Sequence, residues 1–457
     1  MRESSEEWAC VEVNDHRVEI VQGAYHCSKR LDIDLSYYSD LDRLAPTEYL
    51  DACRTAAAIY AADRGILRED TVDGWTRKIQ LKIGVTDSAR SEASAILLEQ
   101  TLSFLTGDYW QISFYESRAD LFVFHEKLPD VGGLGSFDAV CLLSGGLDSL
   151  IGAIDWLEDN PAGRLLLVGH HDAAGPMQDQ NELFSKLSNF YGHRVNLFQP
   201  RVGQKPLGPR QSSEHEPRCL EPSCRSRSIL FLCLGLLAAG AIGPEVPLLV
   251  PENGTIGINI PLIAARRGSC STRTTHPHFV RDFDVWRARF GITNPIINPL
   301  ALKTKGECLE ECRNLALLKQ CVPLSVSCGK RGRRQHWTNK QAKSCGYCVP
   351  CLFRRAALYK IGSDNENYGI DVFDRSQLSL FTGLKMAEDY TDLLSLLSRH
   401  LSTDEVADEI QMNGLMSSDD LVWAQSVVER SLREVHTWIS EEGDQLSIQL
   451  MNSRLEC

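Results

Sequence analysis

The sequence predicts an α/β protein with a parallel sheet in its central part. From Phe137 on, short continuous apolar runs alternate with longer helical patterns, as buried parallel strands joined by crossover helices do. Before that point the apolar residues of the strand segments alternate with polar ones, and after about Ile361 the pattern is helical. We therefore expect an N-terminal α+β domain (1–135), a central domain (136–360) and a C-terminal helical extension (361–457).

Composition and charge narrow the class of protein. The chain has 457 residues, of which 43% are hydrophobic and 24% charged, so about three globular domains are expected. The formal net charge of -13 disfavours nucleic-acid binding over the whole surface, because such binding relies on Lys and Arg. The acidic start resembles no export signal, and the longest apolar run (229–243) is shorter than the roughly 18 to 20 residues of a membrane span. We expect a cytoplasmic protein without a membrane partner.

The N-terminal domain is predicted from alternating and helical patterns. Apolar residues alternate with polar ones around 33–37, 79–85 and 110–114, which is the period of half-buried strands. Helices are expected over 46–60, with Pro46 in the first turn, and over 91–105. The glycine-rich stretch 129–136 is expected to be the linker that ends this domain.

In the central domain we expect buried strands over 139–143, 165–168 and 246–250 and a buried helix over 229–243. In the C-terminal extension an amphipathic helix is expected, with Ser418 as its N-cap. Its apolar stripe consists of Leu421, Ala424, Val427, Val428, Val435, Trp438 and Ile439.

The turn Ser144–Ser149 lies between the first central strand and an amphipathic helix. Gly145 and Gly146 have no Cβ, so their N–H groups can converge on an anion at the positive end of that helix. A Walker A loop would end in Gly-Lys-Ser/Thr, and this turn has no lysine. The sequence predicts a phosphate site of another kind; a plain strand-to-helix turn is the alternative.

Two downstream segments carry further candidate binding residues. Gly169–Asp172 follows the second parallel strand, where loops meet ligand; His171 is a candidate nucleotide contact, and a structural polar loop is the alternative. The segment Glu252–His276 is rich in side chains that can recognise a polar heterocycle or a carboxylate. Its candidate substrate-binding residues are Glu252, Asn253, Asn259, Arg266, Arg273 and His276. A loop held by its own polar side chains is the alternative here.

The 16 cysteines include one group with metal-ligand spacing. Cys345, Cys348 and Cys351 lie three residues apart, and Cys328 precedes them by 17 positions. Four thiolates form the closed tetrahedral shell of a structural zinc site. An iron–sulfur cluster and free thiols are the alternatives.

A concentrated positive charge surrounds these cysteines. The segment 328–360 has nine Lys or Arg residues and no Asp or Glu. Such a segment could hold ATP phosphates, an acidic partner or nucleic acid, or it could only compensate the charge of a thiolate-rich site.

The turn Ser-Gly-Gly-Leu-Asp-Ser resembles the pyrophosphate loop of the PP-loop ATPases, and with the cysteine group and Leu352-Phe-Arg-Arg355 the chain resembles QueC, the 7-cyano-7-deazaguanine synthase family. This resemblance implies a Rossmann-like (HUP-type) core that uses ATP and Mg²⁺. It implies that Asp148 organises the magnesium or the turn, that Lys305 reaches the phosphates, with Lys303 as the competing lysine, and that Arg227 lies near the nucleotide. The phosphate contacts that it implies are Ser144, Gly145, Gly146, Leu147 and Ser149.

The chain departs from QueC by its two terminal domains and by the long spacing between Cys328 and Cys345. With Trp75–Arg77, Leu105–Trp110 and the 251–277 region, it is similar to the QueC-like proteins of the bacterial Qat anti-phage system. That resemblance implies adenylation of a 7-deazaguanine carboxylate for attack by an amine, ammonia or that of a partner protein. The partners it implies are a small acceptor protein, an ATPase and a TatD-like nuclease. The alternatives are 7-cyano-7-deazaguanine synthase itself, a tRNA-modifying PP-loop enzyme and a non-catalytic nucleotide-binding scaffold.

Overall fold

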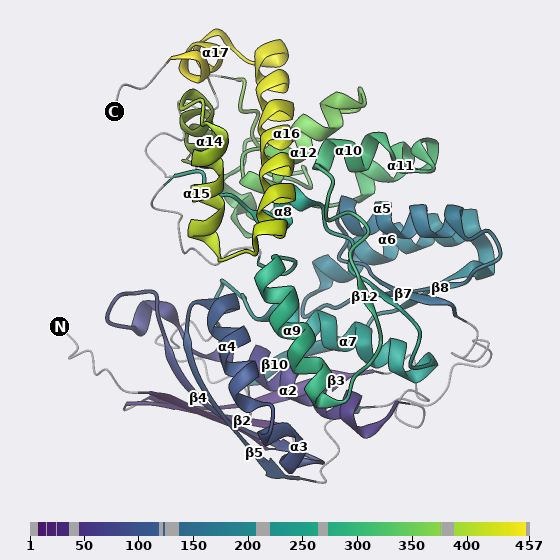
Figure 1. Cartoon of the computed structure of the whole chain (residues 1–457), viewed down its shortest axis with the longest axis vertical. Helices are drawn as coiled ribbons and strands as arrows, with labels where there is room; N and C mark the ends of the chain where they lie inside the picture. Colours follow the sequence, from purple (N-terminus) through teal and green to yellow (C-terminus); the bar gives the residue numbers. More distant parts are fainter. Residues whose placement is uncertain are drawn as a thin grey trace. The chain divides into compact units, whose positions relative to one another are not determined.

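The computed structural model has a mixed α/β fold with two sheets (Figure 1). It describes residues 8–14, 16–23, 25–35, 45–117, 122–123, 137–206, 220–263, 273–374, 376 and 388–453. The chain divides into two compact units: unit 1 is Met1–Ser144, Ala162–Leu249 and Phe279–Ile297, and unit 2 is Gly145–Pro161, Val250–His278 and Asn298–Cys457. The expected linker 129–136 lies outside the described residues.

The first sheet belongs to unit 1 and is mixed. Its order is β10-β3-β2-β1-β4-β5, with β6 beside β3; β1 is parallel to β4, and β4 is parallel to β5. The strands are β1 (Ala9–Asn14), β2 (Arg17–Gln22), β3 (Tyr25–Asp34), β4 (Lys78–Val85), β5 (Tyr109–Glu116), β6 (Phe122–Val123) and β10 (Arg201–Pro206). Strand β10 comes from the central part of the sequence and pairs antiparallel with β3, Arg201 facing Asp34. The expected N-terminal domain and the central part therefore share one sheet.

Helix α2 (Thr47–Gly65) is buried along most of its length and packs on α7 (Arg227–Ile242), the apolar helix expected from the sequence. The single helix expected over 91–105 is instead two, α3 (Ser88–Glu92) and α4 (Ala95–Thr106). Asp87 caps α3 by accepting from Arg90 N, so that helix begins earlier than expected.

The second sheet of unit 1 is entirely parallel, which confirms the expected parallel sheet. Its order is β12-β11-β7-β8-β9. The strands are β7 (Ala139–Leu142), β8 (Leu165–Val168), β9 (Val195–Phe198), β11 (Leu248–Leu249) and β12 (Ile296–Ile297). Strands β7 and β8 are buried at every position, because continuous apolar runs face protein on both sides of a parallel sheet.

The remaining helices connect or follow these strands. They are α5 (Leu147–Asp159), α6 (Ala174–Tyr191), α8 (Gly254–Ile258), α9 (Pro277–Phe290), α10 (Lys305–Glu310), α11 (Leu315–Cys321), α12 (Val349–Lys360), α14 (Glu388–Ser398), α15 (Thr403–Asn413), α16 (Ser418–Glu442) and α17 (Gln445–Asn452), with 3-10 turns at Arg68–Asp70, Gly192–Arg194, Val322–Leu324 and Arg331–His336. The N-cap expected at Ser418 is wrong by one residue: Ser417 accepts from Asp420 N and caps α16. Among these described helices, none has the length and apolar character that a membrane crossing needs.

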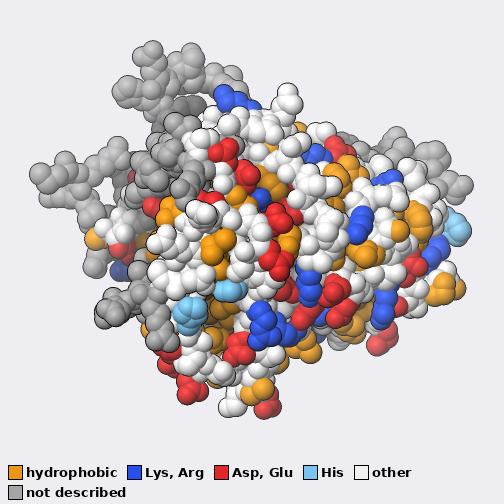
Figure 2. Space-filling view, turned by 90° about the horizontal axis from the view of Figure 1, so that it is seen from above, with side chains coloured by type: hydrophobic (Ala, Val, Ile, Leu, Met, Phe, Trp, Pro, Cys, Tyr) orange, Lys and Arg blue, Asp and Glu red, His pale blue; other side chains and the backbone are white. Residues whose placement is uncertain are grey.

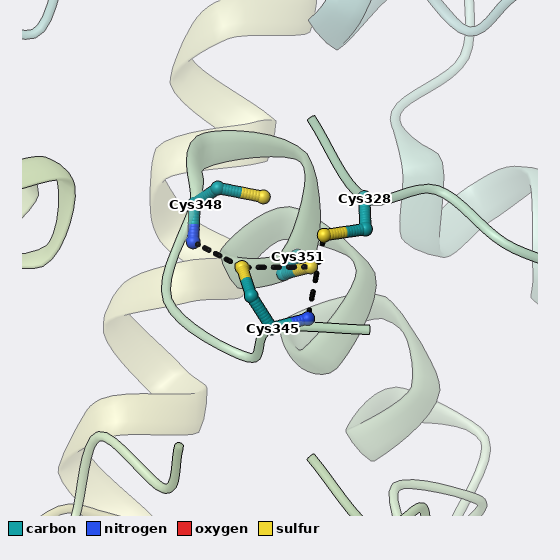
Figure 3. A group of neighbouring side chains, drawn as sticks. All are labelled: Cys328, Cys345, Cys348 and Cys351. Carbon is teal, nitrogen blue, oxygen red and sulfur yellow. Dashed lines mark hydrogen bonds between the residues drawn. The ribbon is translucent and has the colours of Figure 1, made fainter. Parts of the chain in front are cut away.

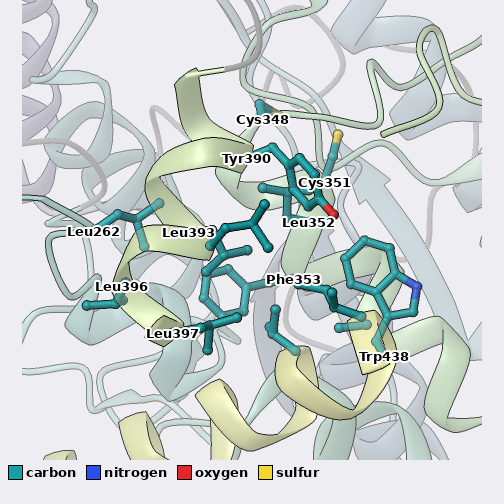
Figure 4. Close-up of a cluster of buried hydrophobic side chains, with 14 of the residues drawn as sticks. Leu262, Cys348, Cys351, Leu352, Phe353, Tyr390, Leu393, Leu396, Leu397 and Trp438 are labelled. Carbon is teal, nitrogen blue, oxygen red and sulfur yellow. The ribbon is translucent and has the colours of Figure 1, made fainter. Parts of the chain in front are cut away.

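A hydrophobic cluster forms the core of unit 2 (Figure 4). It joins α12, α14 and α16 through buried side chains such as Phe353, Leu393 and Trp438. Cys348 and Cys351 belong to the same cluster. The cysteine group is therefore built into the packing of these helices.

Candidate functional site

The turn Ser144–Ser149 follows β7 and leads into α5, as the sequence predicts. Gly145 has φ of 91°, a left-handed conformation that favours glycine. Its carbonyl accepts a hydrogen bond from Val326 N at 2.8 Å. Gly146 is the N-cap of α5 and offers no side chain to the helix start, and Ser149 Oγ donates to Gly146 O at 3.1 Å. The chain thus has backbone N–H groups at the start of a 13-residue helix without a side-chain cap.

Asp148 is the centre of a polar cluster in unit 2. Lys305 Nζ donates to both carboxylate oxygens of Asp148, at 2.8 and 3.0 Å. Asn253 Nδ2 donates to Asp148 Oδ2 at 2.8 Å. The side chain of Lys305 is only 4% exposed and that of Asp148 15%, so this ion pair is largely shielded from water. The structure brings together three of the candidate residues.

Local structure orients both partners of Asp148. Lys305 is the first residue of α10, which begins with a capping box formed by Thr304 and Glu307. Asn253 is the N-cap of α8: its Oδ1 accepts from Ile256 N at 3.1 Å, which leaves Nδ2 to face Asp148. Lys303, the competing lysine, pairs with Glu311 at 2.8 Å.

Glu252 lies beside this cluster and is partly buried. Its Oε2 accepts from Thr275 Oγ1 at 2.5 Å. The pKa of this carboxyl is raised to about 7, mainly by burial and also by the negative charge of Asp148, while Thr275 and Lys305 oppose the rise. A carboxyl with a pKa near neutrality can take up or release a proton under physiological conditions.

The other candidate substrate residues have different surroundings. Asn259 ends α8 in the left-handed conformation and its carbonyl accepts from Asn413 Nδ2 at 3.2 Å. Arg273 is buried and donates to Asn413 O at 2.6 Å. His276 is buried, and its Nδ1 accepts from His278 N at 3.2 Å. Arg266 lies outside the described residues.

Arg227 and His171 belong to unit 1. Arg227 is the first residue of α7 and donates to His170 O at 3.4 Å. His171 follows β8 at a bridge to Arg201, and burial lowers its pKa. Next to it, Asp172 accepts from Tyr60 OH at 2.7 Å.

Two residues of α2 that hold this part of unit 1 were not predicted from the sequence. One is Tyr60; the other is Asp63, whose Oδ2 accepts from both the backbone N and Oγ of Ser226 at 2.8 Å, immediately before Arg227. The signal in the sequence was the carboxylate of Asp63 within the alanine-rich, apolar segment 56–65. A buried charge needs polar partners, so this carboxylate could have been expected to bind another segment.

The four cysteines form a compact group in unit 2 (Figure 3). Their sulfur atoms all lie within 4.8 Å of one another, and three of the four residues are buried. Cys345 N donates to Cys328 Sγ and Cys348 N donates to Cys345 Sγ, both at 3.3 Å. Hydrogen bonds from the neighbouring cysteines lower the pKa of Cys328. Four convergent sulfurs with backbone donors fit a metal such as zinc. The expected grouping of the four cysteines as possible metal ligands is therefore confirmed.

Comparison with known proteins adds no relative. No family model, curated protein or solved structure matches the chain.

Four of the nine basic residues in 328–360 pair with acidic residues from other segments. Lys330 pairs with Asp389 at 2.8 Å, Arg354 with Glu366 at 2.8 Å, and Lys360 with Glu310 at 2.9 Å. Arg355 pairs with Asp364 and Asp371. On the face drawn in Figure 2, basic and acidic side chains likewise lie among one another. Charge compensation within the fold accounts for these four residues.

Proposed function

We propose that this protein is a PP-loop ATP pyrophosphatase that adenylates a carboxylate substrate. The observation that carries the proposal is the cluster of Asp148, Lys305 and Asn253 at a glycine turn that opens a helix. A carboxylate and an ammonium beside the N-terminus of a helix that has no side-chain cap are suited to the binding of a magnesium-bound triphosphate.

The order of the parallel sheet supports a Rossmann-like core. Numbered in chain order, its strands read 5-4-1-2-3, which is the doubly wound order when read from the other edge. In such sheets, ligands bind beyond the carboxyl ends of the strands where the order reverses. Here the reversal lies between β7 and β11, and the segments that follow these two strands contain Asp148 and Asn253.

The proposed reaction has two steps. A substrate carboxylate oxygen attacks the α-phosphorus of ATP, the bond to the β-phosphate bridging oxygen breaks, and pyrophosphate leaves. An amine then attacks the acyl carbon of the acyl-adenylate, AMP leaves, and the amine loses one proton. Mg²⁺, when bound, would neutralise phosphate charge, with Asp148 as the residue to hold it. Lys305 would stabilise the negative charge on the phosphates.

We infer a 7-deazaguanine carboxylate as the substrate, on the basis of the resemblance to QueC-like proteins. Glu252 and Asn253 offer an acceptor and an amide beside Asp148, and a carboxylate such as Glu252 can pair with the N–H edge of a guanine-like ring. The same resemblance makes QatC of the Qat system the proposed relative. A partner protein's amine is then the proposed acceptor, because two added terminal domains offer docking surface that ammonia does not need.

The test is to incubate the protein with ATP, Mg²⁺ and the deazaguanine acid and to measure AMP and pyrophosphate. Asp148→Asn should reduce pyrophosphate release by about 100-fold or more. Asp159→Asn, in the same helix but 55% exposed, is the matched control and should leave the rate unchanged. ADP as the only nucleotide product would refute adenylation. Substrate-independent ATP binding without any turnover would favour a scaffold.

A further inference from the structure

We propose that α16 of the C-terminal extension is a positioning element of the candidate ATP site, with Glu434 fixing the start of α10 so that Lys305 reaches Asp148. This inference rests on the proposed function. It assigns the extension a role in the reaction in addition to its packing.

The carboxylate of Glu434 binds on both sides of Lys305. It accepts from Thr304 Oγ1 at 2.5 Å and from Gly306 N at 3.1 Å. A Cβ on Gly306 would lie 2.5 Å from Glu434 Oε1. A larger residue at position 306 would push the carboxylate away, so this close contact next to Lys305 depends on the glycine.

Arg430, one helical turn before Glu434, holds the same segment from a second side. Its guanidinium donates to Leu302 O at 3.0 Å and pairs with the carboxylate of Glu307. Glu307 Oε2 in turn accepts from Thr304 N at 2.9 Å within the capping box. The backbone from Leu302 to Glu307 is thus tied to α16 by two charged side chains.

The same helix also holds the second partner of Asp148. Ser431 Oγ and Thr255 Oγ1 lie 2.5 Å apart, and Thr255 is the second residue of α8, which Asn253 caps. From α15, Asn413 Nδ2 donates to Ile258 O at 2.8 Å. Both side chains that contact Asp148 therefore come from segments held by the C-terminal extension.

Such contacts matter for rate as well as for stability. The ammonium of Lys305 must lie within hydrogen-bonding distance of its partners, and a displacement of about 1 Å in a catalytic geometry can cost about 100-fold in rate. Arg430, Ser431 and Glu434 have the spacing of one helix face. Packing alone would need only the apolar residues of α16, such as Val427 and Trp438.

The experiment compares Glu434→Ala and Glu434→Gln with Glu442→Ala, a matched control on the same helix that is exposed. Pyrophosphate release by Glu434→Ala should fall by about 10- to 100-fold in kcat, with a smaller change in KM for ATP. Glu434→Gln keeps one acceptor oxygen for the two donors, so its rate should lie between those of Glu434→Ala and the wild type. The control should equal the wild type. Equal rates for Glu434→Ala and the wild type would overturn the proposal.

A double-mutant comparison separates positioning from general destabilisation. If Glu434 acts through Lys305, Glu434→Ala should have little further effect on kcat in a Lys305→Ala background. An equal fold-loss in both backgrounds would overturn the proposal.

Hydrogen exchange gives a readout that does not depend on activity. The amide of Gly306 should exchange at least tenfold faster in Glu434→Ala, while amides in α12 keep their wild-type rates. Unchanged exchange at Gly306 would overturn the positioning role. A wild-type protein that releases no pyrophosphate would instead refute the proposed function and leave this exchange result intact.

Discussion

Arg354 can test whether the basic residues of the segment 328–360 stabilise the fold. Its side chain is 0% exposed and donates to Glu366 through Nε and NH2, both at 2.8 Å. It also donates to Ser325 Oγ at 3.0 Å and to Val322 O at 2.9 Å. Val326, which follows Ser325, donates its N–H to Gly145 O. Arg354 therefore connects α12 to the segment that contacts the glycine turn.

Replacing Arg354 by Met would keep an unbranched apolar chain in place of the arginine stem and remove every one of these bonds. Breaking a buried ion pair by removing one partner costs about 3–5 kcal/mol. At about 2–4 °C per kcal/mol for a unit of this size, the melting temperature should fall by roughly 6–20 °C. Arg333→Met is the matched control, because Arg333 is exposed and a surface change costs less than about 0.5 kcal/mol.

The assay is thermal unfolding of the full chain, with its metal content checked before heating. The double variant Arg354→Met/Glu366→Leu should recover part of the loss, because it no longer leaves a carboxylate without its partner. A melting temperature for Arg354→Met within about 2 °C of the wild type would refute the reasoning. In that case the buried bonds of Arg354 would contribute little to stability.

Three further predictions concern the cysteine group and Glu252. Gly346→Ala should destabilise unit 2 and lower the bound zinc per chain, because Gly346 has φ of 86° and a Cβ would lie 2.4 Å from Ile370 O; an unchanged zinc content measured by atomic emission would contradict this. Cys351→Ser should abolish stoichiometric zinc binding and lower the melting temperature, because the sulfur lies inside the core of α12, α14 and α16; if iron and sulfide are found in the wild type instead, the site holds a cluster. Burial raises the pKa of Glu252 from 4.5 to about 7, so the folded chain holds its proton longer than the unfolded chain, and stability should fall as the pH rises from about 4.5 to 7. Glu252→Gln should remove that fall, and a difference in melting temperature that is constant from pH 5 to 8 would contradict it.

Periodicity predicted the elements whose burial repeats along the chain. The apolar runs of β7 and β8 and the helix α7 were expected at nearly their observed positions, because their side chains face protein on all sides. The start of α3 at Ser88 was not expected, since it depends on Asp87 accepting from Arg90 N and not on hydrophobic spacing.

For the candidate site, the sequence predicted which residues take part but not which of them contact one another. Spacing alone indicated the four cysteines, because metal ligation requires a fixed chemistry at short intervals. The sequence favoured Lys305 and left Lys303 as its competitor, and the contact of Lys305 with Asp148 depends on the local structure that starts α10 at Thr304. The contact of Asp63 with Ser226 and that of Glu434 with Gly306 gave no sequence pattern, because each joins residues more than 100 positions apart.

The pairing of β10 with β3 has a consequence for how the chain is made. Besides β2 and β6, β3 pairs with Arg201–Pro206, which is synthesised last, so the first sheet cannot be finished until the ribosome has passed both β7 and β9. A nascent chain would carry an unprotected strand edge over that interval, and such edges promote misassembly. Expression of residues 1–135 alone would make that edge permanent and should yield aggregated protein, whereas a fragment extended beyond β10 would be free of this defect.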